Sequence, residues 1–423
     1  MEKRSWRNVT KDGRRAFLLR GGALAGAAFA ALSASPAGAT EDTALNVPEW
    51  MKTQGRPILS PAYGQPADHE KDVIRRASAI TPSDTASWSF TPLQDLLGTI
   101  TPNGLFFERH HGGVPSIVPE RHRLLVHGLV ERPLLFTMDD LLRFPAESRI
   151  HFLECSGNGY SEWKVPTGES VQFTHGLLSC CEWTGAPLAT VLDEVGVKPE
   201  GKWILAEGAD AAAMTRSIPL EKALDDALVV YAQNGEHLRP EQGYPLRLLL
   251  PGFEGNMSVK WLRRLKIANR PFQTREETSK YTDLKPDGTA RQFSFYMEAK
   301  SVITFPSPGQ SLRSPGFYEI SGLAWTGHGR VRSVDVSVDG GRSWNEARLQ
   351  EPVLSRALTR FRLPWKWNGA PAILQSRVVD ASGYVQPTRA QLIAVRGTNS
   401  QYHYNGIQSW QVTAEGEVRN VHA

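Results

Sequence analysis

Residues 151–160 read His-Phe-Leu-Glu-Cys-Ser-Gly-Asn-Gly-Tyr, and they form the most informative stretch of the chain. The apolar residues 150–153 predict a short strand, and the small residues 156–159 predict a tight turn. Cys155 is therefore expected at the end of a strand, where backbone and ligand can approach closely. Taken by itself, the stretch is equally compatible with a buried cysteine that packs as a small apolar side chain.

The composition is that of an ordinary globular protein. The 423 residues are 40% hydrophobic and 22% charged, which allows two or three domains. The formal net charge of +4 depends on residues 1–39, which hold 7 basic and 2 acidic side chains and leave 41 basic and 42 acidic ones elsewhere. Nothing in this balance indicates a nucleic-acid partner.

The chain contains three cysteines, Cys155, Cys180 and Cys181. Because two of them are adjacent, a disulfide framework is not expected. The sequence has no C-x-x-C-H, which argues against an attached c-type haem, and three thiolates are too few for an iron–sulfur cluster bound by cysteine alone. A redox protein of this composition would pass its electrons to a partner.

The first 90 residues contain an expected export signal and an extended arm. Residues 14–18 read Arg-Arg-Ala-Phe-Leu, a Gly/Ala-rich run follows at 21–34, and residues 37–39 are a small-residue cleavage site. We expect residues 1–39 to be a twin-arginine signal for folded export to the periplasm. The apolar run is too short to span a bilayer, so no membrane span is expected. Residues 40–90 are rich in Pro, Ser and Asp and predict an extended arm, to which no site is assigned.

An α/β pattern begins near residue 91 and continues to about residue 295. Residues 101–107 predict a turn and a short strand, which lead into Glu108-Arg109-His110-His111 and two glycines. These side chains could bind an anion or a metal, or could belong to a plain surface loop. A zinc site would need two further ligands at the usual spacing.

A second candidate site lies about a hundred residues later. Residues 243–252 predict an apolar strand that carries one cation, Arg247, and a cation in such a strand needs an anionic partner. Ser258 and Lys260 follow closely and supply a hydroxyl and an ammonium suited to a phosphate. The alternative for these cations is a solvated strand edge.

Short alternating strands replace the α/β pattern after about residue 295. Residues 318–323, 334–338 and 376–380 each predict a strand, and the second ends in a Gly-Gly hairpin turn. Such strands with Gly/Pro turns are typical of an all-β sandwich. No residue in its body indicates chemistry, so we expect an interaction or dimerisation domain.

Together these stretches resemble the sulfite oxidase family of molybdenum enzymes. The matching pieces occur in the family's order: T-P-N-G-L-F-F-E-R-H-H, L-E-C-S-G-N, a W-T-G-A-P-L helix start, G-Y-P-L-R-L-L-L-P-G, S-V-K-W-L-R-R and V-S-V-D-G-G-R-S-W. The resemblance covers about residues 90–400. It implies an α+β protein with a mixed α/β molybdopterin domain at 91–295, followed at 296–423 by an immunoglobulin-like dimerisation domain with a C-terminal tail.

The resemblance also implies one molybdenum–molybdopterin cofactor per chain, which holds the metal through a dithiolene, with Cys155 as the additional thiolate ligand of the metal. A thiolate suits a soft, redox-active metal. Tyr281 matches the family's tyrosine beside the metal, and Arg109 matches an arginine that faces the substrate oxyanion. At position 242 the family usually carries histidine, where this chain has glutamine. The cofactor contacts implied are Phe107, Glu108, Arg109, His110, His111, Cys155, Asp210, Gln242, Arg247, Ser258, Val259 and Lys260.

Two departures from the family's pattern concern the substrate. The family's C-A-G-N-R-R reads C-S-G-N-G-Y here, so Tyr160 replaces an arginine of the substrate pocket. Near the C-terminus, where the family has Trp-His-Arg, residues 402–404 read Tyr-His-Tyr. Both changes remove positive charge that would bind sulfite.

Within the family the chain therefore looks most like the sulfane dehydrogenases of Sox sulfur-oxidation systems. That likeness implies sulfur bound to a carrier protein as the substrate, a c-type cytochrome subunit as the electron acceptor, and a homodimer formed through the C-terminal domain. Three alternatives stay open: a dehydrogenase of free sulfite, a sulfoxide reductase on the same fold, and a cofactor-free binding protein.

Overall fold

The computed structural model describes residues 63–79, 81, 83–166, 170–399 and 401–423, together with Met51 and Gln54. Its contacts divide the chain into Met1–Ala67 and a compact unit, Asp68–Ala423, which contains every element discussed below. The predicted signal at residues 1–39 lies outside the described residues. None of the helices in the described part has the length and apolar character needed to cross a bilayer.

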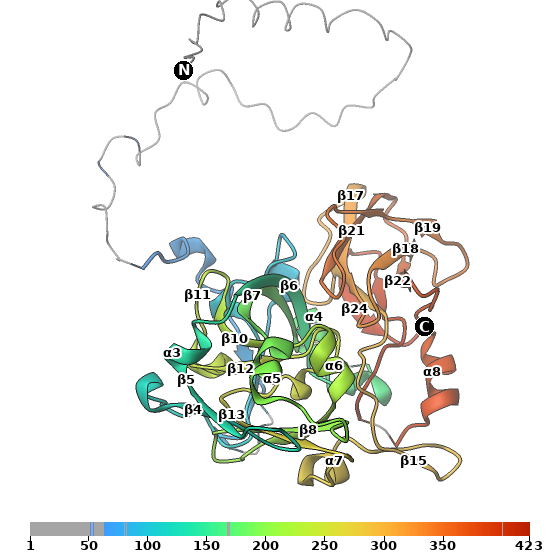
Figure 1. The fold of residues 1–423 in the computed structure, drawn as a ribbon. Coiled ribbons are helices and arrows are strands. Elements are labelled where there is room, and N and C mark those ends of the chain that lie inside the picture. The colour runs from blue at the N-terminus through green and yellow to red at the C-terminus, as the bar shows by residue number, and fades with distance from the viewer. Residues whose placement is uncertain are drawn as a thin grey trace, which may run out of the picture. The chain divides into compact units, whose positions relative to one another are not determined.

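A five-stranded antiparallel sheet places Cys155 directly after its edge strand β6 (Figure 1). The order is β11-β10-β7-β6, and β12 also pairs with β10. The strands are β6 Glu147–Glu154, β7 Leu178–Pro187, β10 Leu228–Gln233, β11 Glu236–His237 and β12 Arg247–Leu249. The end of β6 is buried on both faces, as a strand is when both of its faces are covered.

A second five-stranded sheet, of order β5-β4-β13-β8-β9, lies on the other side of a shared apolar core. Its strands are β4 Arg123–Gly128, β5 Leu134–Thr137, β8 Trp203–Gly208, β9 Thr215–Pro219 and β13 Leu262–Ala268. The helices α3 Met138–Leu141, α5 Leu188–Val195 and α6 Leu220–Asp225 contribute to the same core. Thr137 caps α3, because its hydroxyl accepts from Asp140 N while the Asp140 carboxylate accepts from Thr137 N.

Shorter elements surround these sheets. The strands β1 Arg76–Ala77 and β2 Trp88–Phe90 form a small sheet with β3 Glu108–Arg109, and β14 Asp283–Leu284 pairs with β15 Ala290–Arg291. The remaining short helices before the sandwich are α4 Val171–His175, α7 Arg275–Ser279, η2 Asp68–Glu70, η3 Leu93–Asp95, η4 Asn103–Leu105, η5 Pro119–Arg121, η6 Tyr160–Trp163, η7 Pro240–Gln242 and η8 Gly255–Met257.

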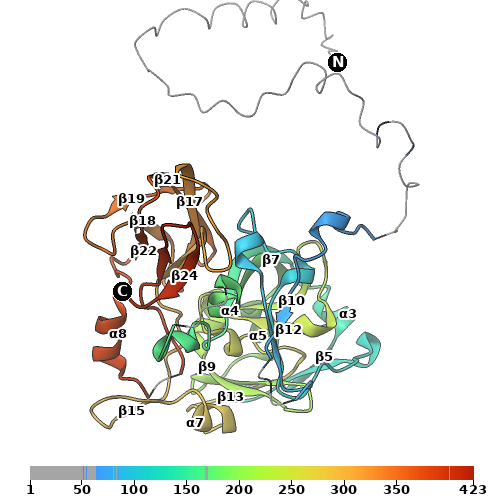
Figure 2. The same cartoon turned by 180° about the vertical axis from the view of Figure 1, so that it is seen from behind.

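Two antiparallel sheets after residue 299 form the expected β-sandwich, drawn in orange to red in Figures 1 and 2. One sheet contains β16 Lys300–Phe305, β17 Gly316–Trp325, β21 Thr359–Trp367 and β20 Arg348–Leu349. The other contains β19 Asn345–Glu346, β18 Val331–Ser337, β22 Ala372–Asp380, β23 Ser409–Val412 and β24 Val418–Val421. The helix α8 Arg389–Arg396 lies between β22 and β23 in the chain.

The sandwich shares its core with the sheet that carries Cys155. Phe152 on β6 and Leu178 and Cys180 on β7 belong to the same buried cluster as Trp325 and Phe361 of the sandwich. Apolar side chains from both parts are therefore removed from water together. This shared core explains why Asp68–Ala423 forms one compact unit.

Two local expectations were wrong. Residues 183–188 were expected to open a helix, but β7 continues to Pro187 and α5 begins at Leu188. Pairing with β10, in which Ala186 lies opposite Val229, overrides the local preference. The strand expected within residues 101–107 is instead the single turn η4, and pairing begins only at Glu108.

Candidate active site

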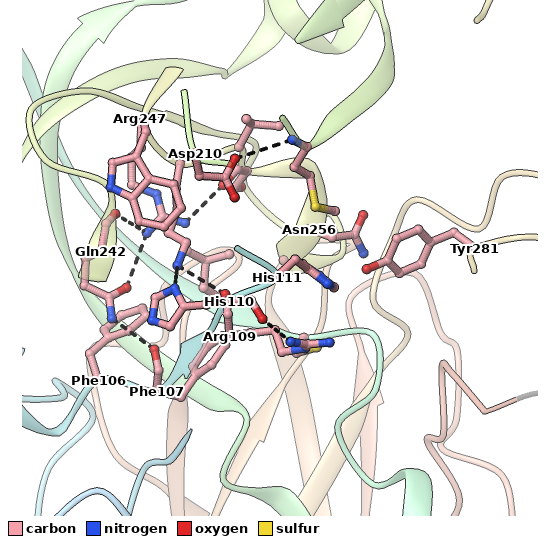
Figure 3. Close-up of a pocket in the computed structure, with 18 residues that line it drawn as sticks. Phe106, Phe107, Arg109, His110, His111, Asp210, Gln242, Arg247, Asn256 and Tyr281 are labelled. Carbon is pink, nitrogen blue, oxygen red and sulfur yellow. Dashed lines mark hydrogen bonds between the residues drawn. The ribbon is translucent and has the colours of Figure 1, made fainter. Parts of the chain in front are cut away.

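A cavity of about 720 Å³, counted with the open solvent at its mouth, lies beside the end of β6 (Figure 3). Every residue proposed for the site lines this cavity except Glu108 and Tyr160. The lining residues that the sequence did not reveal are Phe106, Leu153, Met214, Gly255, Asn256 and Trp261. All but Met214 lie within three residues of a proposed residue in the sequence, so motif matching reached the correct segments.

Cys155 sits in a turn closed by backbone hydrogen bonds. Its N–H donates to the Leu177 carbonyl at 3.0 Å, and its carbonyl accepts from Asn158 N at 2.9 Å. Burial raises the pKa of the Cys155 thiol, so the free side chain is protonated at neutral pH. A bound soft metal would displace that proton, because the thiolate is the ligating form.

One end of the cavity holds a buried guanidinium with spare hydrogen-bonding capacity. Arg247 is 3% exposed, and it donates to the carbonyls of Gln242 at 2.9 Å and Ser258 at 3.1 Å. Its Nε is buried and has no hydrogen-bond partner among the described residues. Burial lowers the pKa of Arg247 to about 10. A buried cation with an unused donor fits an anionic ligand.

Lys260 adds a second, partly buried cation at the same end. Its ammonium donates to the carbonyls of Arg109 at 3.2 Å and Glu241 at 2.9 Å, and meets His110 Nδ1 at 2.9 Å. Burial lowers the pKa of Lys260, and the charge of Arg247 lowers it further. Within the described residues neither cation forms an ion pair with a carboxylate. The donor set therefore fits a phosphate-bearing cofactor.

The other residues proposed to contact the cofactor at this end surround the two cations. Gln242 bridges the two motifs, because its Nε2 donates to the Phe107 carbonyl at 3.0 Å and its backbone carbonyl accepts from Arg247. The Ser258 hydroxyl accepts from Leu250 N at 3.0 Å and so holds the approach to β13. Asp210, which follows β8, and Val259 complete the wall.

The histidine pair does not form a metal centre. His110 uses Nε2 to meet Glu108 at 2.7 Å, while its Nδ1 faces Lys260. Glu108 therefore acts through His110 rather than by facing the cavity. Burial, and then the charge of Arg109, lower the pKa of His111 to about 4, so its ring is neutral at pH 7. Among the described residues no three His, Cys, Asp or Glu side chains cluster as metal ligands, which leaves the zinc alternative unsupported.

Residues assigned to the N-terminal arm reach the site, although no role was expected for them. Arg75 pairs with Glu108 and donates to the Phe106 carbonyl at 3.1 Å. Trp88 lies opposite Arg109 in the β2–β3 pairing, and the Arg109 guanidinium lies 5.3 Å from the centre of its ring. A short aromatic segment in a polar arm gives no local signal of such pairing.

The other end of the cavity is aromatic. Tyr281 lines it, and the ring of Tyr402 lies 5.3 Å from that of Tyr281. A Cβ at Gly157 would lie 3.5 Å from the Tyr402 ring and 3.8 Å from Cys155 Sγ, so glycine gives Tyr402 room beside the cysteine. Burial raises the pKa of Tyr402 to about 12 and raises the pKa of Tyr281 as well. Both phenols are neutral at physiological pH.

A buried charge network supports Tyr281 from behind. The Arg216 guanidinium lies 4.3 Å from the centre of the Tyr281 ring and pairs with Glu254 at 3.1 Å. Burial alone would raise the pKa of Glu254, but the charge of Arg216 lowers it to about 2. His403 meets the other Glu254 oxygen at 3.3 Å. The Tyr281 ring thus packs against a buried ion pair between Arg216 and Glu254.

Tyr160 requires a correction. It begins η6, is 41% exposed and does not line the cavity. Gly159 before it has a φ of 85°, a left-handed conformation that redirects the chain at this point. Tyr404, in the Tyr-His-Tyr segment, is buried against Trp163. Of the aromatic residues singled out in these two segments, Tyr402 is therefore the one that approaches Cys155.

Comparisons with known proteins agree on one family of enzymes. Residues 111–276 match the family described as oxidoreductase molybdopterin binding domain, and residues 291–409 match the Mo-co oxidoreductase dimerisation domain. Mitochondrial sulfite oxidase of Mus musculus is 32% identical over 371 residues, which cover 81% of this chain and 67% of that protein. Sulfite oxidase of Gallus gallus is 34% identical over 314 residues, or 68% of each chain.

A solved structure is similar as well. The crystal structure of the sulfane dehydrogenase SoxCD from Paracoccus pantotrophus matches with a TM-score of 0.89 and 49% sequence identity. The match covers 91% of this chain and 100% of that chain.

Proposed function

Because the chain belongs to the sulfite oxidase family of molybdenum oxidoreductases, we propose that it oxidises sulfur carried on a larger molecule in preference to free sulfite. The family membership and the similarity to a sulfane dehydrogenase establish a molybdenum-dependent sulfur oxidoreductase. The choice of substrate is the new step, and it rests on the charge and shape of the cavity beside Cys155.

The residues of the cavity fit the cofactor that the family uses. Cys155 would supply the thiolate ligand, and Arg247 and Lys260 would hold the anionic end. When bound, the molybdenum cofactor supplies the two-electron oxidation of sulfur with oxygen from water. The chain's own residues bind and orient the substrate, exclude water and fix the charges around it.

The observation that carries the proposal is the low positive charge at the aromatic end. Arg109 is the cation on that part of the lining, and its described neighbours His111, Tyr281 and Tyr402 are neutral at pH 7. Sulfite carries between one and two negative charges at neutral pH, so one cation matches it incompletely. Two aromatic rings, the buried Tyr281 and the partly buried Tyr402, favour an apolar, chain-borne sulfur group instead.

Comparative turnover tests this proposal. Purified protein should be assayed with sulfite, with methionine sulfoxide as an oxidant substrate, and with a small carrier protein bearing a cysteine persulfide. We expect the highest kcat/KM for the persulfidated carrier. An equal or higher value for sulfite would favour the sulfite dehydrogenase, and turnover of the sulfoxide alone would favour the reductase. A protein that contains no molybdenum would support the binding protein.

The electron acceptor and the assembly are part of the same proposal. We propose a c-type cytochrome subunit as the acceptor, because the chain is similar to a sulfane dehydrogenase of a Sox system and this sequence has no C-x-x-C-H for a haem of its own. A homodimer through residues 296–423 is supported by the match to the dimerisation domain. Co-purification with a haem-staining protein, and its reduction on adding substrate, test the acceptor.

We propose the periplasm as the location, with residues 1–39 acting as a twin-arginine signal. Replacing the pair, Arg14→Lys with Arg15→Lys, should leave precursor in the cytoplasm, because the pair is read by a receptor. Cell fractionation measures the result. Mature protein at the normal periplasmic level would contradict this location signal.

A further inference from the structure

The residue before Cys155 is a fully buried carboxylate. Glu154 ends β6 and has no exposed surface. Its Oε1 accepts from Lys300 Nζ at 2.6 Å and from Asn158 Nδ2 at 2.9 Å, while its Oε2 accepts from Trp325 Nε1 at 2.6 Å. Both carboxylate oxygens are therefore engaged by strong donors.

The two strongest donors come from the β-sandwich. Lys300 begins β16 and Trp325 ends β17, and the two residues lie opposite each other in the antiparallel pairing of these strands. Lys300 is 1% exposed and Trp325 is fully buried. The carboxylate of Glu154 is thus held by a rigid two-stranded edge rather than by a loop.

The same cluster holds both ends of the turn that presents Cys155. Lys300 also donates to the Asn158 carbonyl at 3.3 Å, and the Asn158 side-chain oxygen accepts from Leu177 N at 3.1 Å. A Cβ at Gly255 would lie 2.8 Å from the Glu154 carbonyl, so Gly255, which lines the cavity, packs directly against the backbone of Glu154. Little freedom of movement is left at this point of the chain.

The Glu154 carboxylate and the Cys155 thiol belong to neighbouring residues, so fixing one side chain also fixes the direction of the other. Successive side chains of an extended chain point in opposite directions, so Glu154 faces the sandwich and Cys155 faces the cavity. A buried ion pair is a weak source of stability, because desolvation offsets much of the attraction and neutral side chains of similar shape can replace it. The cluster is better explained by the fixed position that it gives to the next residue.

We propose that Glu154, Lys300 and Trp325 form a positioning cluster, through which the β-sandwich sets the place and direction of Cys155 in the cavity. All three are positioning residues, since none of them lines the cavity. The proposal rests on the proposed role of Cys155 as the ligand of molybdenum. Its geometric part can be tested without the metal.

The first experiment uses protein purified without cofactor. Glu154→Gln combined with Lys300→Met removes both charges, while the glutamine carbonyl can still accept from Trp325. Iodoacetamide labelling followed by peptide mass spectrometry reports each thiol separately. Cys180 and Cys181 are fully buried and serve as internal references. We expect Cys155 to be labelled about ten-fold faster than in the wild type, because a turn with fewer holding contacts opens more often and exposes the thiol to the reagent.

The second experiment uses the loaded enzyme. The same double variant should lower kcat about ten-fold and leave KM within about two-fold, because substrate contacts are unchanged while the ligand is displaced. The electron paramagnetic resonance signal of Mo(V) should broaden or shift. The single variant Lys300→Met should exaggerate both effects, since it leaves a buried carboxylate without its cation. Should Lys300→Met fail to fold, the double variant carries the test.

Lys222 offers a matched control. It is 4% exposed and pairs with Asp226 at 2.6 Å, but it does not line the cavity. Lys222→Met should lower the melting temperature as Lys300→Met does and leave the labelling of Cys155 and the Mo(V) signal unchanged. If it changes both as much, general loosening explains the results and the proposal is overturned. Unchanged labelling and an unchanged Mo(V) signal in the double variant would overturn it as well.

Failure of the proposed function would look different. If Cys155→Ser retained full turnover, Cys155 would not be the ligand, whereas the labelling rates in cofactor-free protein would still decide whether the cluster positions the thiol.

Discussion

The two ends of the cavity are built in different ways, and Figure 3 shows them on opposite sides of His111. At one end, Arg247 and Lys260 donate to backbone carbonyls of nearby segments, including those of Gln242, Ser258 and Glu241. At the other end, Tyr281 and Tyr402 come from segments more than a hundred residues apart. The two cations of the first end come from one short stretch of chain, although their surroundings include Phe107 and Arg109, whereas the two tyrosines are brought together only by tertiary packing.

This difference has a consequence for function. The C-terminal segment lies across the Cys155 turn, because His403 N donates to the Ser156 carbonyl at 2.8 Å. Replacing a side chain in that segment alters what faces the substrate and leaves the cations of the cofactor end untouched. Substrate choice can therefore change within this fold while cofactor binding is kept.

The largest expected effect is at the cofactor end. Lys260→Met removes a partly buried cation and three donated hydrogen bonds, so molybdenum content should fall by about a hundred-fold, the upper range for loss of supporting contacts around a metal site. Metal analysis of purified protein measures it. Lys266→Met, a partly exposed position on β13 that does not line the cavity, is the control and should keep its molybdenum.

The next largest effect concerns the KM for sulfite, and it compares a substitution at the aromatic end of the cavity with one at the surface. Tyr402→Arg offers sulfite a charge-assisted hydrogen bond of roughly 1.5–3 kcal/mol, so KM for sulfite should fall at least about ten-fold. Molybdenum content should be unchanged. Tyr160→Arg, outside the cavity, is the control, and its sulfite KM should stay within about two-fold. An equal response in both variants would show that the cavity charge does not set substrate choice.

A smaller effect is expected where the arm supports Arg109. Trp88→Leu removes the ring beneath the guanidinium, an interaction of about 0.5–1 kcal/mol, so KM should rise about two- to five-fold with kcat little changed. Trp344→Leu removes an equivalent ring beneath Arg377 in the sandwich, at 4.4 Å, and should leave the kinetics unaltered. A change in kcat alone would mean that Trp88 does not act through substrate binding.

A further effect, of similar size, is a pH dependence of stability in cofactor-free protein. The pKa of His111 is about 4 in the folded chain against an ordinary value of 6.5, so as pH falls between these values the unfolded state takes up the proton first. Stability is then lost over this window. The full shift corresponds to roughly 3 kcal/mol, and partial exposure reduces it to about 1 kcal/mol. The melting temperature should be measured from pH 7 to pH 4, and it should fall more for the wild type than for His111→Gln. An equal fall in both proteins would contradict the assignment.

The sequence was sufficient for the parts of the site that are local. The strand before Cys155, the cations Arg247 and Lys260, and the sandwich could all be read from periodicity, charge and motif. The support from Trp88 and Glu154 could not, because it depends on which distant segments pair. The motif singled out residues 402–404, but it did not show that Tyr402 is the one that approaches Cys155. Tyr160 was misplaced for the same reason, since a motif position does not say on which side of a turn the side chain lies.

The central claim is that Cys155 is the protein ligand of molybdenum, and X-ray absorption at the molybdenum edge tests it most directly. The wild type should show three sulfur ligands, two from the cofactor's dithiolene and one from the chain. Cys155→Ser should show two, with turnover reduced more than about a hundred-fold, because an alkoxide is a poorer donor to a soft metal. Three sulfur ligands in that variant, or near-normal turnover, would contradict the account.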